Sequence, residues 1–299
     1  MTLLRPFTLH EPESVDSVLP LLSRYGDNGR ILAGGTELLL AMKQGILGYD
    51  HLINIKHIPG LDEIDYDDKK GQLAVGPLVT HRALETSDLI KRKFPLIADM
   101  ERHVANIRIR NAGTVGGNLC WADPHSDVAT LLLAYRSRVK VVGSDGERVI
   151  ELDDFLIDYY ETALKEDEML TEIHIPDSPP ESCGAYLRFK LAERPTVGVA
   201  VILTFGPGDE TITDANITLG CVNPTPMRAR EAEEITRGKG IDEVLATVDS
   251  IGAVAAKESS PTDDIHASEW YKREMIRVMV KRTIQEAYRR RTGQKKAAE

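Results

Sequence analysis

The segment Ile109-Arg-Asn-Ala-Gly-Thr-Val-Gly-Gly-Asn-Leu119 gathers three glycines, a threonine and two asparagines within eleven residues. Glycine lets the backbone approach a ligand closely, and successive backbone N–H groups with nearby hydroxyl and amide side chains form a concave site for an anion. We therefore predict an anion-binding loop at residues 111–118.

A second glycine pair lies about 80 residues earlier, in Ile31-Leu-Ala-Gly-Gly-Thr-Glu-Leu38. The pattern predicts a strand, a Gly34-Gly35 turn and a short helix, and free N–H groups at a helix start suit a diphosphate. Taken alone, such a pair is more often a tight turn that binds nothing. It matches neither the GxGxxG nor the Walker A pattern. Together, the two segments could hold one diphosphate from opposite sides.

The residues after the second segment, Cys120-Trp-Ala-Asp-Pro-His-Ser-Asp127, place carboxylates around an imidazole. Such a cluster could bind a divalent ion. Pro124, however, forces a turn, and Asp127 stands where a helix cap or an acceptor for a ligand hydroxyl would stand. We therefore expect no metal site here. Trp121 could pack beside a ligand, but a tryptophan that follows a glycine-rich turn more often packs in the core.

Hydrophobic periodicity predicts a βαβ-like opening, more strands and helices up to the proline-rich segment 176–180, and then strands followed by helices. Ser14 and Thr80 are the expected caps of two helices. The predicted strands are 7–10, 30–33, 52–55, 73–75, 139–142, 148–152, 170–175, 185–191, 199–205 and 212–219. The predicted helices with explicit bounds are 37–43, 94–104, 127–135, 228–236, 241–256 and 268–291.

Composition and charge exclude several classes of protein. The 299 residues carry 37 Lys and Arg against 47 Asp and Glu, a net charge of −10 that argues against nucleic-acid binding. No apolar run reaches the roughly 18 residues of a membrane span, and the start of the chain lacks the pattern of a signal peptide. The three cysteines are far apart, which indicates a reducing, cytoplasmic compartment.

The remaining charged and titratable residues show no pattern of a site. The histidines outside the cluster above, His81 among them, lack any ligand spacing and are expected to be ordinary surface or core residues. The run Arg289-Arg-Arg291 is expected to be a solvated helix end.

The two glycine-rich segments, in this order and at this separation, resemble the FAD-binding medium subunit of the molybdenum hydroxylases. Carbon monoxide dehydrogenase, xanthine dehydrogenase and the aldehyde or N-heterocycle dehydrogenases belong to that family. Residues 269–282 also resemble its C-terminal helix, so the resemblance covers essentially the whole chain. The benzoyl-CoA reductase subtype is unlike this chain, because only Cys120 is near the place of its cysteine-bearing insertion. The segment 194–200 looks shorter than its family counterpart, and what covers the flavin face there stays unassigned.

The resemblance implies an α+β fold of the vanillyl-alcohol-oxidase (PCMH) type. A two-part FAD-binding domain would span residues 1–176, with subparts of about 1–57 and 58–176. A C-terminal domain of antiparallel sheet and helices would span 181–291, and 292–299 would be a tail.

The resemblance also implies which residues hold FAD. The diphosphate would be bound by the two glycine-rich segments, that is, by Leu32, Ala33, Gly34, Gly35, Thr36, Glu37 and Leu38 together with Thr114, Val115, Gly116, Gly117 and Asn118. Asp127 would match the family's acidic residue, with Asp123 a weaker candidate. Leu170 and Lys190 would be neighbours of the isoalloxazine, where a cation stabilises the negative charge of reduced flavin. Without the resemblance, Leu170 reads as core and Lys190 as an exposed strand residue.

The function implied is that of an electron-transfer subunit with no catalytic residue and no metal of its own. A small 2Fe-2S subunit would deliver electrons to FAD, a large molybdopterin subunit would hydroxylate the substrate, and the complex would be (αβγ)2. The external acceptor stays open among quinone, NAD, dioxygen and a cytochrome. Two alternatives remain, a self-contained FAD-dependent oxidoreductase of the same fold and a structural subunit that binds no flavin.

Overall fold

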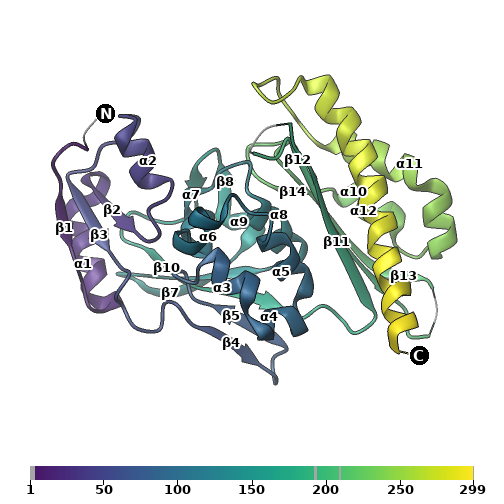
Figure 1. Cartoon of the computed structure of the whole chain (residues 1–299), viewed down its shortest axis with the longest axis horizontal. Helices are drawn as coiled ribbons and strands as arrows, with labels where there is room; N and C mark the ends of the chain where they lie inside the picture. The colour runs from purple at the N-terminus through teal and green to yellow at the C-terminus, as the bar shows by residue number, and fades with distance from the viewer. Residues whose placement is uncertain (1–3, 192–193, 209, 299) are drawn as a thin grey trace.

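A three-stranded parallel sheet begins the chain in the computed structural model, which describes residues 4–191, 194–208 and 210–298 (Figure 1). Its order is β1–β3–β2, from strands β1 (Thr8–His10), β2 (Gly29–Leu32) and β3 (His51–Asn54). Helices α1 (Val15–Tyr25) and α2 (Leu38–Lys43) join these strands, with a 3-10 turn (Gly26–Asn28) before β2. The side chain of Ser14 caps α1 by accepting the N–H of Ser17. The predicted βαβ-like opening is confirmed.

A five-stranded antiparallel sheet with helices against it forms the middle of the molecule. In sheet order, its strands are β4 (Ile64–Asp67), β5 (Gln72–Val75), β10 (Met169–Pro176), β6 (Arg138–Gly143) and β7 (Gly146–Glu151). The helices between β5 and β6 are α3 (His81–Thr86), α4 (Asp88–Lys93), α5 (Pro95–Glu101), α6 (Ile107–Ala112), α7 (Val115–Trp121) and α8 (Asp127–Ala134). Sheet and helices share one core, in which Phe94, Leu119 and Leu131 are fully buried. Apolar burial of this kind is the main stabilisation of the fold.

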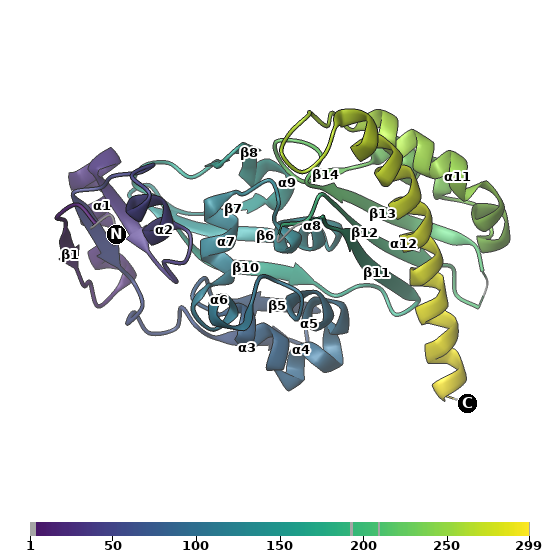
Figure 2. The same cartoon turned by 45° about the horizontal axis from the view of Figure 1, so that its top comes forward.

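A four-stranded antiparallel sheet and three helices form the C-terminal part, as predicted (Figure 2). The strands are β11 (Ser182–Phe189), β12 (Val197–Phe205), β13 (Ile212–Gly220) and β14 (Met227–Arg228). The helices are α10 (Arg230–Thr236), α11 (Ile241–Glu258) and α12 (Glu269–Ala298), and they share a core with the sheet. Between β7 and β10 lie the small elements α9 (Leu152–Phe155), β8 (Leu156–Asp158) and β9 (Glu161–Thr162).

Helix α8 joins the middle and C-terminal parts. It packs on β12 and β13, the two central strands of the C-terminal sheet. Helices α11 and α12 share a separate hydrophobic core with the same sheet. The contact is close: a Cβ on Gly220 would lie 2.0 Å from Thr130 Oγ1, and the hydroxyl of Thr218 donates to the carbonyl of Thr130 at 2.9 Å. The position of β13 relative to α8 is therefore fixed by close packing.

Two helical regions differ from the prediction. Residues 111–118, predicted as a loop, lie in α6 and α7 with only Gly113 and Thr114 between them. Glycine disfavours a helix interior by about 1 kcal/mol, which is why the sequence indicated a loop. The side chain of Thr114 caps helix α7. Gly116 lets the helix pack directly against Pro77, where the Cβ of any other residue would collide.

Helix α12 runs to Ala298 rather than ending at Arg291. The prediction of a solvated basic end is wrong for Arg291, whose side chain is buried. It pairs with Glu210 and with Glu181 (3.4 Å) and lies 3.7 Å from the ring centre of Phe205. These charges hold the helix to the sheet. Among the described residues, no helix combines the length and apolar character that crossing a membrane requires.

Candidate functional site

A cleft of about 820 Å³ is lined by residues from the N-terminal, middle and C-terminal parts of the chain. This volume lies near the upper end of the roughly 300–1,000 Å³ typical of small-molecule and cofactor sites. The turn between β2 and α2 contributes one wall, and α6 and α7 contribute another. In both cartoon views, α2 lies on the side of the N-terminal part that faces α7 (Figures 1 and 2).

The two glycine-rich segments meet in this cleft, as the sequence predicts. A Cβ on Gly34 would lie 2.2 Å from the carbonyl oxygen of Ala112, and a Cβ on Gly117 would lie 3.8 Å from Cβ of Ala33. No side chain fits at Gly34, because the two backbones are in direct contact. Glycine is therefore required here by close approach rather than by chain flexibility.

The first segment presents backbone donors to the cleft. Within the described chain, the amide N–H groups of residues 34–38 donate to no protein acceptor. Gly35 adopts φ +74°, which turns the backbone between strand and helix, and its carbonyl accepts the N–H of Leu39. The hydroxyl of Thr36 also has no partner in the described part of the chain. Consecutive free N–H groups of this kind bind anions.

The second segment offers far fewer backbone donors than we expected. Four consecutive N–H groups are already bonded inside the protein: Val115 to Val79 O (2.9 Å), Gly116 to Pro77 O (3.1 Å), Gly117 to Thr114 Oγ1 (3.1 Å) and Asn118 to Thr114 O (2.9 Å). What this segment brings to the cleft is the side chain of Asn118. Its oxygen accepts the hydroxyl of Ser126, which leaves the amide NH₂ without a partner among the described residues.

Fourteen of the sixteen predicted site residues line the cleft. The exceptions are Leu32 and Val115, whose side chains are 7% and 1% exposed and pack in hydrophobic cores. Leu170 lines the cleft although it is buried in β10. Lys190, one residue beyond β11, is exposed at the cleft.

Asp127 and Asp123 line the cleft but bond to protein groups rather than converging on a metal position. Asp127 accepts from the hydroxyl of Tyr186 and from Arg188. Burial raises the pKa of Asp127, against the effect of Arg188. Asp123 accepts the backbone N–H of His125 at 2.9 Å. No set of three candidate ligands converges anywhere in the described chain.

Arg188 is a cleft residue that the sequence reasoning missed. Tyr186 and Arg188 alternate along β11, and Lys190 continues the same spacing one residue beyond its end, which places the three on one side. The resemblance points to Lys190 as a neighbour of the flavin. The two-residue period of strand side chains leads from Lys190 back to Arg188 and Tyr186.

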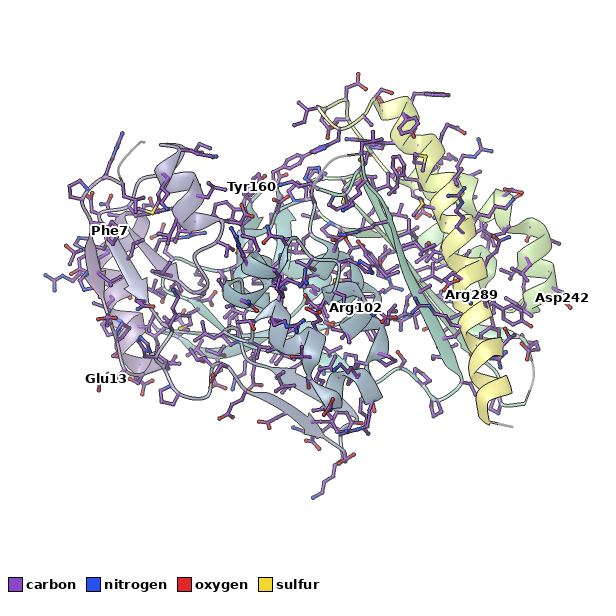
Figure 3. All side chains as sticks on the ribbon, in the orientation of Figure 1. Phe7, Glu13, Arg102, Tyr160, Asp242 and Arg289 are labelled. Carbon is purple, nitrogen blue, oxygen red and sulfur yellow. The ribbon has the colours of Figure 1, made fainter. Side chains whose placement is uncertain are left out.

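Arg194 is a second missed residue, and it lies where the chain was expected to be shorter than its family counterpart. It pairs with Asp123 and, at 3.5 Å, with Glu37 of the first glycine segment. Arg194 therefore connects the C-terminal part to the cleft wall. Tyr160, labelled in Figure 3, lies nearby between β8 and β9, with its ring 5.8 Å from that of Trp121.

His81 and Glu101 form a third missed feature. Nδ1 of His81 and Oε2 of Glu101 are 2.9 Å apart, and the two side chains are 4% and 0% exposed. His81 lines the cleft. The prediction that Thr80 caps a helix is confirmed, because its hydroxyl accepts the N–H of Ala83. That cap places His81 at the first helical position, but nothing in the sequence joins His81 to Glu101.

Two family models match consecutive parts of the chain. The model described as FAD binding domain in molybdopterin dehydrogenase matches residues 5–178, and the model described as CO dehydrogenase flavoprotein C-terminal domain matches residues 188–287.

Curated relatives match over nearly their whole length. The chain is 31% identical to the carbon monoxide dehydrogenase medium chain of Afipia carboxidovorans, covering 94% of this chain and 96% of that one. It is also 31% identical to the nicotine 6-hydroxylase medium subunit of Paenarthrobacter nicotinovorans, covering 92% and 95%.

Solved structures agree with these matches. Carbon monoxide dehydrogenase from Hydrogenophaga pseudoflava superposes with a TM-score of 0.92 at 30% identity, covering 96% of this chain and 99% of that one. Quinoline 2-oxidoreductase from Pseudomonas putida 86 gives 0.88 at 26% identity, covering 95% and 98%.

Proposed function

Because the chain belongs to the FAD-binding medium subunits of the molybdenum hydroxylase family, we propose that it passes electrons from a 2Fe-2S partner subunit, through FAD, to an external acceptor. The chain is thus the FAD-binding component of an oxidoreductase. The observation that carries the proposal is the cleft with its row of free amides at residues 34–38.

The residues of the cleft fit FAD. Five successive N–H groups suit the diphosphate, and the free amide of Asn118 supplies a further donor from the opposite wall. Leu170 and Lys190 line the same cleft, and its volume of about 820 Å³ suits a large cofactor. We assign the diphosphate to residues 34–38 and Asn118.

Leu170 and Lys190, which both line the cleft, suit the isoalloxazine. Bound FAD supplies the redox chemistry, because flavin accepts electrons singly or in pairs and passes them on. Lys190 supplies a positive charge where reduced flavin carries negative charge. Arg188 on the same strand face is partly neutralised by Asp127, so Lys190 is the freer cation of the two. Leu170 forms an apolar surface against the ring system.

We propose a small 2Fe-2S subunit and a large molybdopterin subunit as partners, in an (αβγ)2 complex. The names of the relatives support this, since each is the medium chain or subunit of a named dehydrogenase or hydroxylase. The hydroxylated substrate would then bind in another polypeptide. The three free cysteines suit the reducing cytoplasm. The acceptor is a quinone, NAD, dioxygen or a cytochrome.

Absorbance between 300 and 700 nm, before and after incubation with FAD and removal of excess cofactor, tests flavin binding. We expect retained flavin bands that are lost in Gly35→Asp, which adds negative charge to the proposed diphosphate site. Gly35→Asn is the matched control, because it has the same shape and tolerates the same positive φ without the charge. A colourless wild-type chain that cannot be reconstituted would contradict the proposal.

The partners are tested by purifying the tagged chain from its native cells. We expect co-purification of a molybdenum-containing large chain and an iron-sulfur small chain in equal amounts, with reduction of the flavin by substrate only in the complex. An FAD-loaded chain that has no partners and oxidises a substrate alone would show a self-contained oxidoreductase instead.

A further inference from the structure

The pair of His81 and Glu101 lies beside the first glycine segment. His81 begins α3 and Glu101 ends α5, and their side chains meet in the interior at 2.9 Å. An ideal Cβ on Gly113 would lie 3.2 Å from His81 Cδ2 and 3.4 Å from Thr36 Oγ1. The His81 ring and the Thr36 hydroxyl therefore approach the same point, next to the free amides of residues 34–38.

Glu101 has little besides His81 to balance a charge. Its second oxygen, Oε1, is fully buried and has no partner among the described residues. The small space beside Glu101 is lined by the apolar residues Val75, Leu84, Ile97, Met100, Val115, Val128, Leu132, Ile173 and Ile175. Burial raises the pKa of Glu101, and the charge of His81 opposes that rise. The pair therefore favours the form with no net charge, in which the imidazole and the carboxyl group together hold two protons.

In the net-neutral form, Nε2 of His81 carries a proton. One proton lies between Nδ1 and Oε2, whichever of the two holds it, and the other is on Nε2. Nε2 makes no hydrogen bond within the described residues and is not among the fully enclosed unpartnered atoms. Since His81 lines the cleft, Nε2 is reachable from it.

We propose that Nε2 of His81 donates a hydrogen bond to the FAD diphosphate, and that Glu101 is the positioning residue that keeps this nitrogen protonated. The inference rests on the proposed FAD binding at residues 34–38. Where the free pair has lost a proton, binding of the diphosphate takes one proton from solvent onto the imidazole. No bond in the cofactor changes.

Other charged groups around the pair are paired or neutral. They are Arg82 and Glu85 of α3, His103 after α5, Arg110 of α6, Asp127 of α8 and Arg188 of β11. Arg82 and Arg110 both pair with Glu85, and Arg188 pairs with Asp127. Burial lowers the pKa of His103, so this residue is neutral from pH 7 upward. Burial raises the pKa of Asp127, so Asp127 is the other group whose proton could cause a pH dependence of FAD binding.

The affinity for FAD should therefore fall with rising pH. Once the pair begins to lose its proton, the dissociation constant should rise by up to about tenfold per pH unit, because one proton is linked to binding. His81→Gln should weaken binding at pH 7 by roughly ten- to a hundredfold and flatten the profile, since a hydrogen bond to a charged group is lost. Glu101→Gln should move the fall to lower pH, because the variant lacks the buried carboxyl that favours the net-neutral pair with two protons.

The test is FAD binding by titration calorimetry from pH 6 to 9 for the wild type, these two variants, the rival variant Asp127→Asn and the exposed control His57→Gln. Titrating the wild type in buffers of different ionisation enthalpy counts the protons taken up, and this arm needs no variant. We expect uptake with FAD and with ADP-ribose, which has the diphosphate but no flavin, and none with riboflavin.

Three results would overturn the inference. Proton uptake equal for FAD and riboflavin would do so, as would a pH profile that both variants leave unchanged, or one that only Asp127→Asn abolishes. In each of these cases FAD still binds, so the proposed function stands. A wild-type chain that binds no FAD at any pH would overturn the proposed function and this inference together.

Discussion

The two glycine-rich segments have similar compositions but use glycine differently. In the first, residues 34–38 line the cleft and their N–H groups have no acceptor within the described part of the chain. In the second, residues 115–118 have all four N–H groups bonded inside the protein, and Gly116 packs against Pro77. The first segment offers backbone donors to the cleft, whereas the second holds α7 against its neighbours and reaches the cleft with a side chain. Glycine density alone therefore does not locate an anion site; the partners of the N–H groups do.

The largest effect should come from Gly116→Ala. The new Cβ would lie 2.4 Å from Cβ and 2.6 Å from Cα of Pro77, so backbone must move. Overpacking of this kind should lower the free energy of unfolding by about 3 kcal/mol. Urea denaturation measures the loss, with Gly48→Ala as control, because its Cβ would meet only the end of the Arg5 side chain at 3.6 Å. A variant as stable as the control would contradict the packing role.

Thr36→Ala should act on binding rather than on stability. The Thr36 hydroxyl has no partner in the described chain, so the free energy of unfolding should change by less than about 0.5 kcal/mol. If it donates to the diphosphate, its loss should weaken FAD binding roughly tenfold or more. Fluorescence titration with FAD measures this, and unchanged affinity would remove Thr36 from the site.

Thr114→Ala is the matching substitution in the second segment and should act on stability. The Thr114 hydroxyl accepts the N–H of Gly117 at 3.1 Å as the cap of α7. Losing a cap costs about 1 kcal/mol of stability. Thermal denaturation without FAD should show the loss. If Thr36→Ala destabilised the chain as much as Thr114→Ala does, the distinction between the segments would fail.

The smallest effect should come from Arg194→Gln. Arg194 pairs with Glu37 in the first segment and with Asp123 beyond the second, but its side chain is 41% exposed. Pairs at such exposure contribute less than about 1 kcal/mol. We expect a small loss of stability that shrinks further in 0.5 M salt, because screening weakens exposed pairs. A loss that salt leaves unchanged would indicate packing by Arg194 instead.

The sequence was sufficient for the family, the order of the main elements and the meeting of the two glycine-rich segments. Alternating strands, capped helices and paired glycines are local patterns. It was not sufficient for residues 111–118, because the packing of Gly116 on Pro77 depends on a distant turn. His81 and Glu101 lie on different helices, and Arg194 meets Glu37 from far along the chain, so their contacts exist only in the folded state.

The most direct test is amide hydrogen exchange, residue by residue, in the isotope-labelled chain with and without FAD. We predict that the N–H groups of residues 34–38 exchange quickly in the free chain and become protected when FAD binds. Those of residues 115–118 should be protected in both states, since their acceptors lie within the protein. Rapid exchange at residues 34–38 in the FAD-bound chain, or protection gained only at 115–118, would contradict the division of roles between the two segments.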